Sequence, residues 1–177
     1  TMELNDVNLH NIEERFGRDR FDEKLHGSDL VAFVNWTMVP YMSDIWETIL
    51  KELCPPHHAE RHTIFFDLAD PQKREDEDIA RALKLIEQFN EHFDVILGLN
   101  EKEAWEVSEA LGIEVGEHGR DELERVTLEL NQQIPVSTLV VHPVAYAMAT
   151  SDGAIDTVKG PYIPKPKITT GAGDHFN

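Results

Sequence analysis

Short apolar runs recur along the chain, separated by longer segments in which apolar residues follow helical spacing. Each short run has the length and composition of a buried strand. These runs predict four strands, at residues 30–36, 63–68, 94–99 and 137–142. Two further strand-like segments, at residues 146–150 and 154–158, flank Ser151-Asp152-Gly153, which predicts a hairpin turn.

The segments between the first four runs carry helix signals. Ser43 caps a predicted helix that ends before Pro55-Pro56, and Pro71 opens a long polar helix. The apolar residues of that second helix share one face, namely Ile79, Leu83, Ile86, Phe89 and Phe93. Two more helices are expected, at residues 100–111 and 121–133. This alternation predicts an α/β fold with a mainly parallel sheet and helices on both faces.

Polar residues gather where the predicted strands end. In open parallel sheets, ligands bind at the carboxyl ends of the strands. Asp67 and Asn100 lie at or directly after a predicted strand, and a Thr-Gly-Ala-Gly-Asp segment at residues 170–174 follows a β-rich stretch. The sequence therefore predicts that three polar sites converge on one edge of the sheet.

The segment Gly171-Ala172-Gly173-Asp174 has the composition of a helix entry that receives an anion. Small residues let the backbone approach a ligand, and the free N–H groups of a helix start attract negative charge. At such an anion hole, Asp174 can accept the proton of an attacking hydroxyl while the N–H groups stabilise a transferring phosphoryl group. The alternative is a tight turn in which Asp174 caps a helix.

The residues ITTGAGDHF, at positions 168–176, resemble the C-terminal signature of the ribokinase, or PfkB, family of carbohydrate kinases, D-T-x-G-A-G-D-x-F. The resemblance implies that Asp174 is the catalytic base and that the backbone of Gly171, Ala172 and Gly173 forms the anion hole. It also implies transfer of the γ-phosphate of ATP to a hydroxyl of a sugar or sugar derivative, with ATP and Mg²⁺ as cofactors.

The residues Asn100-Glu101-Lys102-Glu103 resemble the N-x-x-E motif of the same family. The motif follows a strand and organises Mg²⁺ and phosphate, so the resemblance implies that Asn100 and Glu103 contact Mg²⁺ through water. The residue types by themselves leave another interpretation open, because an Asn at a helix start with Glu three residues later is also a capping box.

Residues 67–74, DLADPQKR, resemble a D-x-N-x-R segment that follows a strand in sugar and sugar-acid kinases of the family. The resemblance implies that Asp67 or Arg74 lies near the phosphates or the substrate, as does Thr170 of the signature. The alternative is an ordinary helix start, with Asp70 as the cap and Pro71 in the first turn.

Two departures from the family pattern bear on the cofactors. Ile168 replaces the first Asp of the signature, which in many relatives helps to hold a monovalent cation, so a role for such a cation is in question. The family's T-x-G-x-x-G stretch has no glycine here, since Val144 and Ala147 occupy that region. This second departure puts the ATP-site geometry in question and favours an alternative, a degenerate member that binds a sugar or nucleotide as a sensor or interaction module.

The resemblance covers residues 30–177, the middle and late part of the family fold. The glycine-rich sugar site, the substrate-binding Asp and the β lid of the family are not found before Leu30, and the helices expected after Phe176 are missing. We therefore expect residues 1–177 to form a single, incomplete ribokinase-like domain that is inactive as a kinase by itself. Relatives often dimerise through the lid, so a homodimer remains open, and the sequence does not identify the sugar.

Composition narrows the range of partners. The 177 residues include 34 acidic and 16 basic ones, for a formal charge of −18. A strongly acidic chain argues against nucleic acid or an anionic membrane as the main partner. No signal peptide and no apolar run of membrane-spanning length is found. Cys54 is the only cysteine, so no internal disulfide can form, which fits a cytoplasmic protein.

Two further patterns have an ordinary interpretation. Cys54, His57, His58 and His62 cluster closely enough to suggest a metal site, but the spacing fits a loop between a helix and a strand equally well. The three tryptophans are expected to pack in the core or at its edge, rather than to form a stacking platform, namely Trp36, Trp46 and Trp105.

Overall fold

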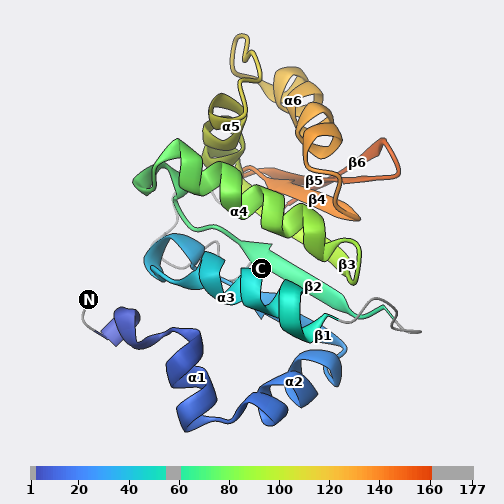
Figure 1. Ribbon diagram of the computed structural model, residues 1–177. Coiled ribbons are helices and arrows are strands. Elements are labelled where there is room, and N and C mark those ends of the chain that lie inside the picture. Colours follow the sequence, from blue (N-terminus) through green and yellow to red (C-terminus); the bar gives the residue numbers. More distant parts are fainter. Residues whose placement is uncertain (1–2, 55–60, 161–177) are drawn as a thin grey trace.

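A six-stranded sheet forms the centre of the protein in a computed structural model that describes residues 3–54 and 61–160 (Figure 1). The strands follow one another in the order β1-β2-β3-β4-β5-β6. Strands β1 to β4 are parallel, and β5 and β6 run antiparallel to their neighbours. Their bounds are β1 Leu30–Phe33, β2 Thr63–Asp67, β3 Asp94–Asn100, β4 Thr138–His142, β5 Tyr146–Ser151 and β6 Ala154–Lys159. The predicted α/β fold with a mainly parallel sheet is confirmed.

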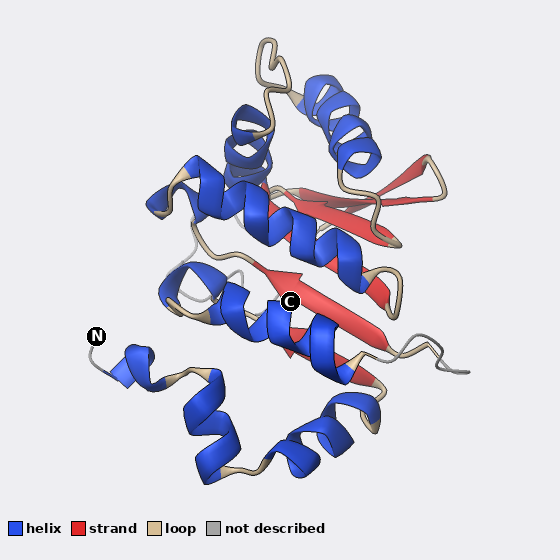
Figure 2. Cartoon of the chain, in the orientation of Figure 1, coloured by secondary structure: helices blue, strands red, loops and turns tan. Residues whose placement is uncertain are grey.

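Helices connect the parallel strands and also precede the first one (Figure 2). The α-helices are α1 Leu9–Arg15, α2 Arg18–His26, α3 Met42–Thr48, α4 Asp76–Phe89, α5 Glu101–Ala110 and α6 Arg120–Gln133. Shorter helical turns are η1 Glu3–Asp6, η2 Trp36–Met38 and η4 Pro71–Lys73, and a π-helical turn, η3 Ile49–Leu53, continues α3. In Figure 1, α3 and α4 lie in front of the strands, and α5 and α6 lie above β4 and β5.

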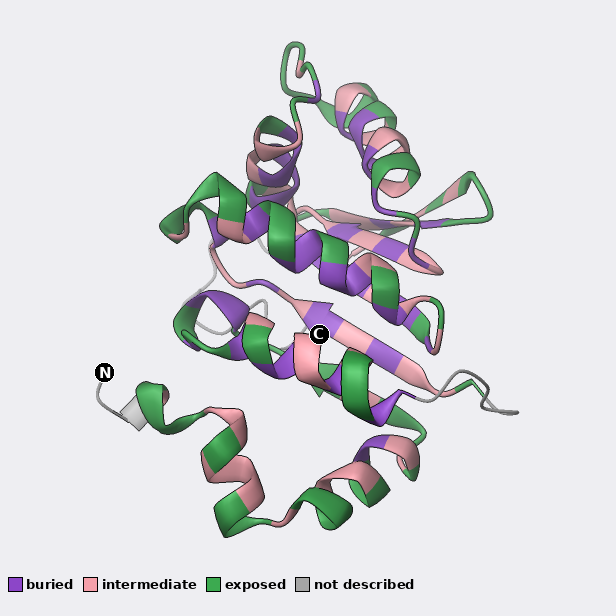
Figure 3. Ribbon diagram, in the orientation of Figure 1, coloured by how far each residue is buried: buried purple, intermediate pink, exposed green. Residues whose placement is uncertain are grey.

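Within the described residues, the connecting helices cover one face of the sheet, whereas we expected both faces to be covered. Buried and partly buried residues alternate along β2 in Figure 3. Ile64 and Phe66 are fully buried, while Phe65, which points to the opposite face, is only partly buried. The reason is the strand order. Each parallel strand lies beside the next one in the chain, so right-handed crossovers keep every connecting helix on the same side.

The core lies between the helices and this covered face. The ring of Phe66 lies 4.9 Å from that of Trp46 in an edge-on contact, and 5.3 Å from that of Phe89. Trp36 and Trp46 are 1% and 0% exposed, and Trp105 is also buried, as the prediction of packing tryptophans requires. This packing holds β1 to β4 in register, so the core determines where their carboxyl ends lie.

Two element boundaries differ from the sequence prediction. The first strand ends at Phe33, because Asn35 adopts a left-handed conformation with φ of 59° and the chain then turns into η2. The helix expected to open at Pro71 begins at Asp76, because residues 71–73 form the separate turn η4. By contrast, the predicted hairpin turn is present between β5 and β6, where Asp152 and Gly153 have φ of 52° and 77°.

Candidate active site

Three strands end in polar residues at the same edge of the sheet. The last residues of β2, β3 and β4 are Asp67, Asn100 and His142, and all three are partly buried. Parallel pairing places Asn100 opposite His142, and Asp67 opposite Gly98. Because side chains alternate along a strand, these three strand-end positions belong to the same side of the sheet. The structure therefore brings Asp67 and Asn100 to one edge, as the sequence predicted.

Asn100 and Glu103 form a complete capping box at the start of α5. The Asn100 side-chain oxygen accepts a hydrogen bond from the Glu103 backbone N–H at 2.9 Å, and the Glu103 carboxylate accepts the Asn100 N–H at 3.0 Å. The residue types allowed this interpretation, and it is confirmed. The other Glu103 oxygen accepts the backbone N–H of Asp70 at 3.0 Å, so Glu103 also links α5 to the turn after β2.

The Glu103 carboxylate is buried, with 6% of the residue exposed. Burial raises its pKa, and the negative charge of nearby Asp67 raises it further. The backbone N–H groups of Asp70 and Asn100, together with His142, lower the pKa without cancelling the effect of burial. The charge of Glu103 is therefore coupled to Asp67 at the end of β2 and to His142 at the end of β4.

The turn after β2 has an uncommon backbone. Ala69 and Asp70 both adopt positive φ, 56° and 61°, although neither residue is glycine. The Asp70 carboxylate accepts hydrogen bonds from Lys73 at 2.9 Å and from Lys102 of α5 at 3.2 Å, and these bonds lower its pKa. Asp70 precedes Pro71 at the start of η4, but its side chain bonds to the lysines instead of capping the turn.

Arg74 binds the turn that follows β1. Its Nε donates to the Thr37 carbonyl at 3.1 Å, and its Nη2 donates to the carbonyls of Trp36 and Val39 at 3.3 and 3.0 Å. The guanidinium also lies 5.0 Å from the centre of a Trp36 ring, and Nη1 pairs with Asp78 at 3.7 Å. These contacts give Arg74 a role within the fold, and its proximity to phosphate stays a prediction.

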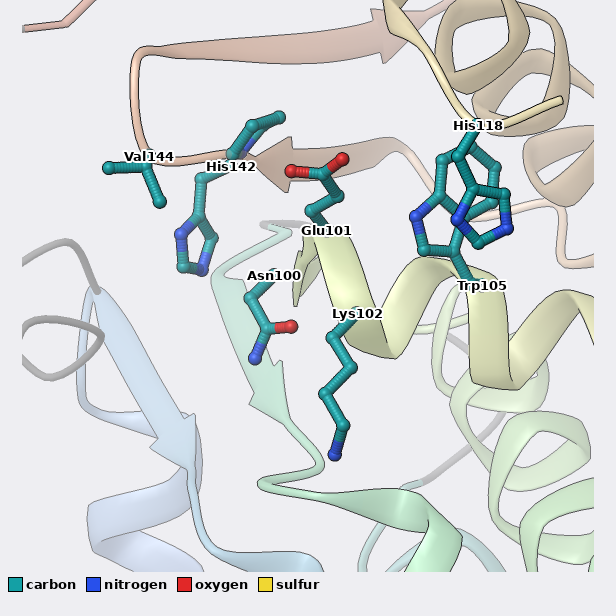
Figure 4. Close-up of a pocket in the computed structure, with 8 residues that line it drawn as sticks. Asn100, Glu101, Lys102, Trp105, His118, His142 and Val144 are labelled. Carbon is teal, nitrogen blue, oxygen red and sulfur yellow. The ribbon is translucent and has the colours of Figure 1, made fainter.

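A pocket opens at this edge, beside the ends of β3 and β4 (Figure 4). Its volume is about 530 Å³, within the range of small-molecule sites. The lining residues come from the start of α5, the segment before α6 and the end of β4: Asn100, Glu101, Lys102, Trp105, His118, His142, Pro143 and Val144. The pocket is polar near Asn100, aromatic at Trp105 and His118, and apolar at Pro143 and Val144.

Several pocket residues were missed by sequence reasoning. Trp105 and His118 lie against each other in Figure 4. Their rings stack with centroids 4.5 Å apart and planes 10° from parallel. Lys102 pairs with Glu106 at 2.9 Å as well as with Asp70. Lys102 lies inside the Asn-x-x-Glu motif, so the sequence carried a signal for it. His118 is thirteen positions from Trp105 across a loop, and no local pattern indicated it.

The turn between β4 and β5 forms the other wall of the pocket. Burial lowers the pKa of His142, although the nearby Glu103 carboxylate acts in the opposite direction. Val144 is 81% exposed, and Ala147 lies in β5 opposite Val158 of β6. Of the two positions that lack the family's glycines, Val144 lines the pocket and Ala147 does not.

The signature segment lies outside the described residues. This includes all of the residues predicted from it, namely Ile168, Thr170, Gly171, Ala172, Gly173 and Asp174. His57 and His58 of the Cys-His cluster also fall outside. Across residues 3–54 and 61–160, no group of three or more His, Cys, Asp or Glu side chains could hold a metal ion. Cys54 is buried, and this burial raises its pKa to about 12.

None of the helices in the described part of the chain has the length and apolar character needed to span a membrane.

Comparison with known proteins finds sugar kinases among the proteins that this chain resembles. A family model described as prokaryotic ketohexokinase matches residues 1–177. A ketohexokinase from Haloferax volcanii is 26% identical over 166 residues, which cover 94% of this chain and 43% of that protein. The chain therefore spans less than half the length of this curated relative.

Two solved structures share the fold. The 2-dehydro-3-deoxygluconokinase of Thermotoga maritima matches with a TM-score of 0.53 and 20% identity, over 77% of this chain and 42% of its own. Phosphofructokinase-2 from Escherichia coli matches with a TM-score of 0.53 and 16% identity, over 89% of this chain and 46% of its own. These likenesses confirm the ribokinase-like fold. The family model, which spans residues 1–177, shows that the chain belongs to the prokaryotic ketohexokinase family.

Proposed function

We propose that the protein to which this chain belongs transfers the γ-phosphate of ATP to a hydroxyl of a sugar, and that the sugar is a ketohexose. The observation that carries the proposal is the arrangement at the end of β3. There Asn100 and Glu103 lie between the ends of β2 and β4, beside a pocket of about 530 Å³. The family match over residues 1–177 and the name of the Haloferax relative support the choice of substrate.

In this proposal Asp174 takes the proton of the sugar hydroxyl. The hydroxyl oxygen forms a bond to the γ-phosphorus, the bond from that phosphorus to the bridging oxygen breaks, and ADP leaves. The backbone N–H groups of Gly171, Ala172 and Gly173 stabilise the charge on the transferring group. Thr170 belongs to the same segment and is proposed to lie near the phosphates.

The residues around Asn100 fit a magnesium–nucleotide complex. Bound Mg²⁺ would neutralise negative charge on the β- and γ-phosphates. Both Glu103 oxygens already accept a backbone N–H, so Glu103 and Asn100 would reach the ion through water. Lys102 and His142 add donors to the same pocket, and Asp67 lies at the neighbouring strand end. A monovalent cation is not part of the proposal, because Ile168 replaces the Asp that would hold it.

The proposal also covers location and assembly. A cytoplasmic protein fits the single cysteine and the sugar-kinase relatives. Sugar and ATP are the expected partners, and nucleic acid is not expected for a chain of charge −18. The dimer suggested by the family resemblance remains part of the proposal for the full-length protein.

One observation favours a second candidate, a sugar- or nucleotide-binding module without kinase activity. Val144 and Ala147 stand in the region where the family carries glycines that lie close to the nucleotide, and Val144 lines the pocket. A side chain there takes up space that a glycine leaves to the ligand. The base at Asp174 favours the kinase, because a binding module needs no proton acceptor at that position.

The test is a kinase assay on the full-length protein with fructose, an aldohexose for comparison, ATP and Mg²⁺. Asp174→Asn should lower kcat by roughly 10²- to 10⁴-fold and leave the thermal midpoint unchanged, because the base is lost and the shape is kept. Asp152→Asn, in the hairpin turn, is the matched control and should keep full activity. An Asp174→Asn variant with unchanged turnover would reject the assigned base. Saturable binding of an ATP analogue without any turnover in the wild-type protein would favour the binding module.

A further inference from the structure

The Glu103 carboxylate holds two segments that are far apart in the sequence. One oxygen accepts the N–H of Asp70 and the other accepts the N–H of Asn100, each at 3.0 Å. Asp70 follows β2, while Asn100 ends β3, so a single side chain connects two neighbouring strand ends. We call these three residues and their two hydrogen bonds the Glu103 clasp.

The segment that the clasp holds would not adopt its conformation without support. Ala69 and Asp70 are consecutive non-glycine residues with φ of 56° and 61°. Such left-handed conformations are unfavourable for residues with a Cβ and persist only where the surroundings enforce them. Here Glu103 binds the Asp70 N–H, and Lys73 and Lys102 bind its carboxylate. The turn is therefore fixed both through its backbone and through its side chain.

The same segment is anchored on its other side to the turn after β1. The Leu68 carbonyl accepts the Thr37 N–H at 3.0 Å. Arg74 donates to the carbonyls of Trp36, Thr37 and Val39. The ends of β1, β2 and β3 are thus joined into one unit, and the Glu103 clasp is the joint between the second and third of these strands.

We infer that Glu103 is a positioning residue, whose carboxylate fixes the end of β2 against the start of α5 and so sets Asp67 relative to Asn100. This inference rests on the proposed kinase function, because only a reaction at this edge makes that geometry matter for rate. It assigns to Glu103 a task within the protein in addition to the proposed contact with Mg²⁺ through water. A misplacement of about 1 Å at such a site can lower a rate by about 100-fold.

The clasp requires a glutamate. Both partners are N–H donors and each binds a different oxygen, so the side chain must offer two acceptor oxygens, and at this length only glutamate has both. In Glu103→Gln the amide NH₂ would face one of the two N–H groups, donor against donor. Glu103→Asp is one methylene shorter and could not span both partners, while Glu103→Ala removes both bonds. All three substitutions should therefore break at least one hydrogen bond of the clasp. The remaining side-chain oxygen of Glu103→Gln could still bind a water on Mg²⁺, so this variant removes the clasp but keeps part of the proposed metal contact.

The direct test is amide hydrogen exchange in the full-length protein. In Glu103→Ala, the amides of Asp70 and Asn100 should both exchange about 10- to 100-fold faster than in the wild type, since each loses a bond to a charged acceptor. In Glu103→Gln at least one of the two amides should exchange faster, because the side-chain NH₂ faces it. Glu109→Gln is the matched control, because Glu109 is an exposed residue of the same helix. Exchange at Asp70 that is the same in both Glu103 variants and in the wild type would overturn the inference.

Kinetics then show whether the loss of the clasp or the loss of the proposed water-mediated Mg²⁺ contact dominates the effect of substituting Glu103. Glu103→Gln should lower kcat by about 10- to 100-fold, with the sugar KM and the half-saturating Mg²⁺ concentration within about 2-fold of wild type. A rise in the half-saturating Mg²⁺ concentration that restores kcat at high Mg²⁺ would overturn the inference, as would an unchanged kcat. Absence of turnover in the wild-type protein would instead reject the proposed function, and the exchange data would still decide for or against the clasp.

Discussion

The turn after β2 and the turn after β4 lie at the same edge of the sheet, but they are held very differently. Residues 68–74 are bound by Glu103, by Lys102 and, through Arg74, by the turn after β1. Residues 143–145 follow β4 as a short connection, and Val144 within it is 81% exposed. One wall of the site is fixed by the protein itself, and the other is open to solvent.

The difference separates two tasks at one edge. A network of backbone and charged hydrogen bonds keeps the ends of β1, β2 and β3 in place before any ligand arrives, which is what preorganisation of a site requires. The open side holds the pocket, where His142, Pro143 and Val144 face Asn100 and Lys102. In the proposed function, the fixed turn would keep the strand ends in place, and the open turn would leave room for a ligand.

The largest effect is expected from removing the anchor of the fixed turn. Arg74→Ala in the full-length protein should lower the free energy of unfolding by about 2–4 kcal/mol, because three partly buried carbonyls lose a charged donor. Chemical denaturation measures this change. Arg81→Ala is the control, since its ion pairs within the described residues, with Asp44 and Glu47, lie at the surface and their loss should cost less than about 1 kcal/mol. Equal losses in the two variants would show that Arg74 is not an anchor.

A smaller effect is expected from the left-handed backbone of the fixed turn. Ala69→Gly should raise the free energy of unfolding by about 0.5–1 kcal/mol, because glycine adopts φ of 56° without steric cost. Ala80→Gly is the matched control, since Ala80 is an exposed residue inside α4 and glycine there should lower stability by about 1 kcal/mol. Denaturant midpoints measure both. Destabilisation by Ala69→Gly would mean that the turn is not strained.

The smallest effect is a pH dependence on the open side. Burial lowers the pKa of His142 below its ordinary value of 6.5, so the stability tied to its neutral form is present above pH 6.5 and is lost as the pH falls. The raised pKa of Glu103 acts with the opposite sign, because its contribution is lost as the pH rises. Thermal midpoints between pH 7.5 and 5.5 should therefore fall less steeply in His142→Gln than in the wild type.

Val144→Thr is the control for that measurement, because it alters the same turn without adding or removing a titrating group. Its midpoints should follow the wild-type curve at every pH. If the thermal midpoints of His142→Gln and of the wild type change equally with pH, His142 is not desolvated. The pH dependence would then not distinguish the open turn from the fixed turn.

Local features of the fold were predictable because they depend on neighbours in the chain. The Asn100–Glu103 capping box spans three residues, so its amino acids carry enough information to place the start of α5. The hairpin turn at Asp152-Gly153 is equally local. Apolar runs located the strands, although left-handed residues such as Asn35 and Asp70 moved element boundaries that periodicity could not anticipate.

Features that join distant segments were not predictable. The bond from Asp70 to Glu103 crosses 33 positions, and the Arg74 bond to Thr37 crosses 37. The Trp105–His118 stack depends on how the loop before α6 folds back. The strand order, which decides that the connecting helices of the described residues share one face, also has no local signature, because it results from which strands pair.

The sequence by itself determined the α/β class, the positions of the strands and helices, and the motifs that place the chain among sugar kinases, because each depends on residue type and short spacing. The tertiary structure alone decided that Glu103 joins two strand ends, that Arg74 binds the turn after β1, and that a pocket opens beside β4. The physical reason is that a hydrogen bond between distant residues exists only after the core has set the strands in register.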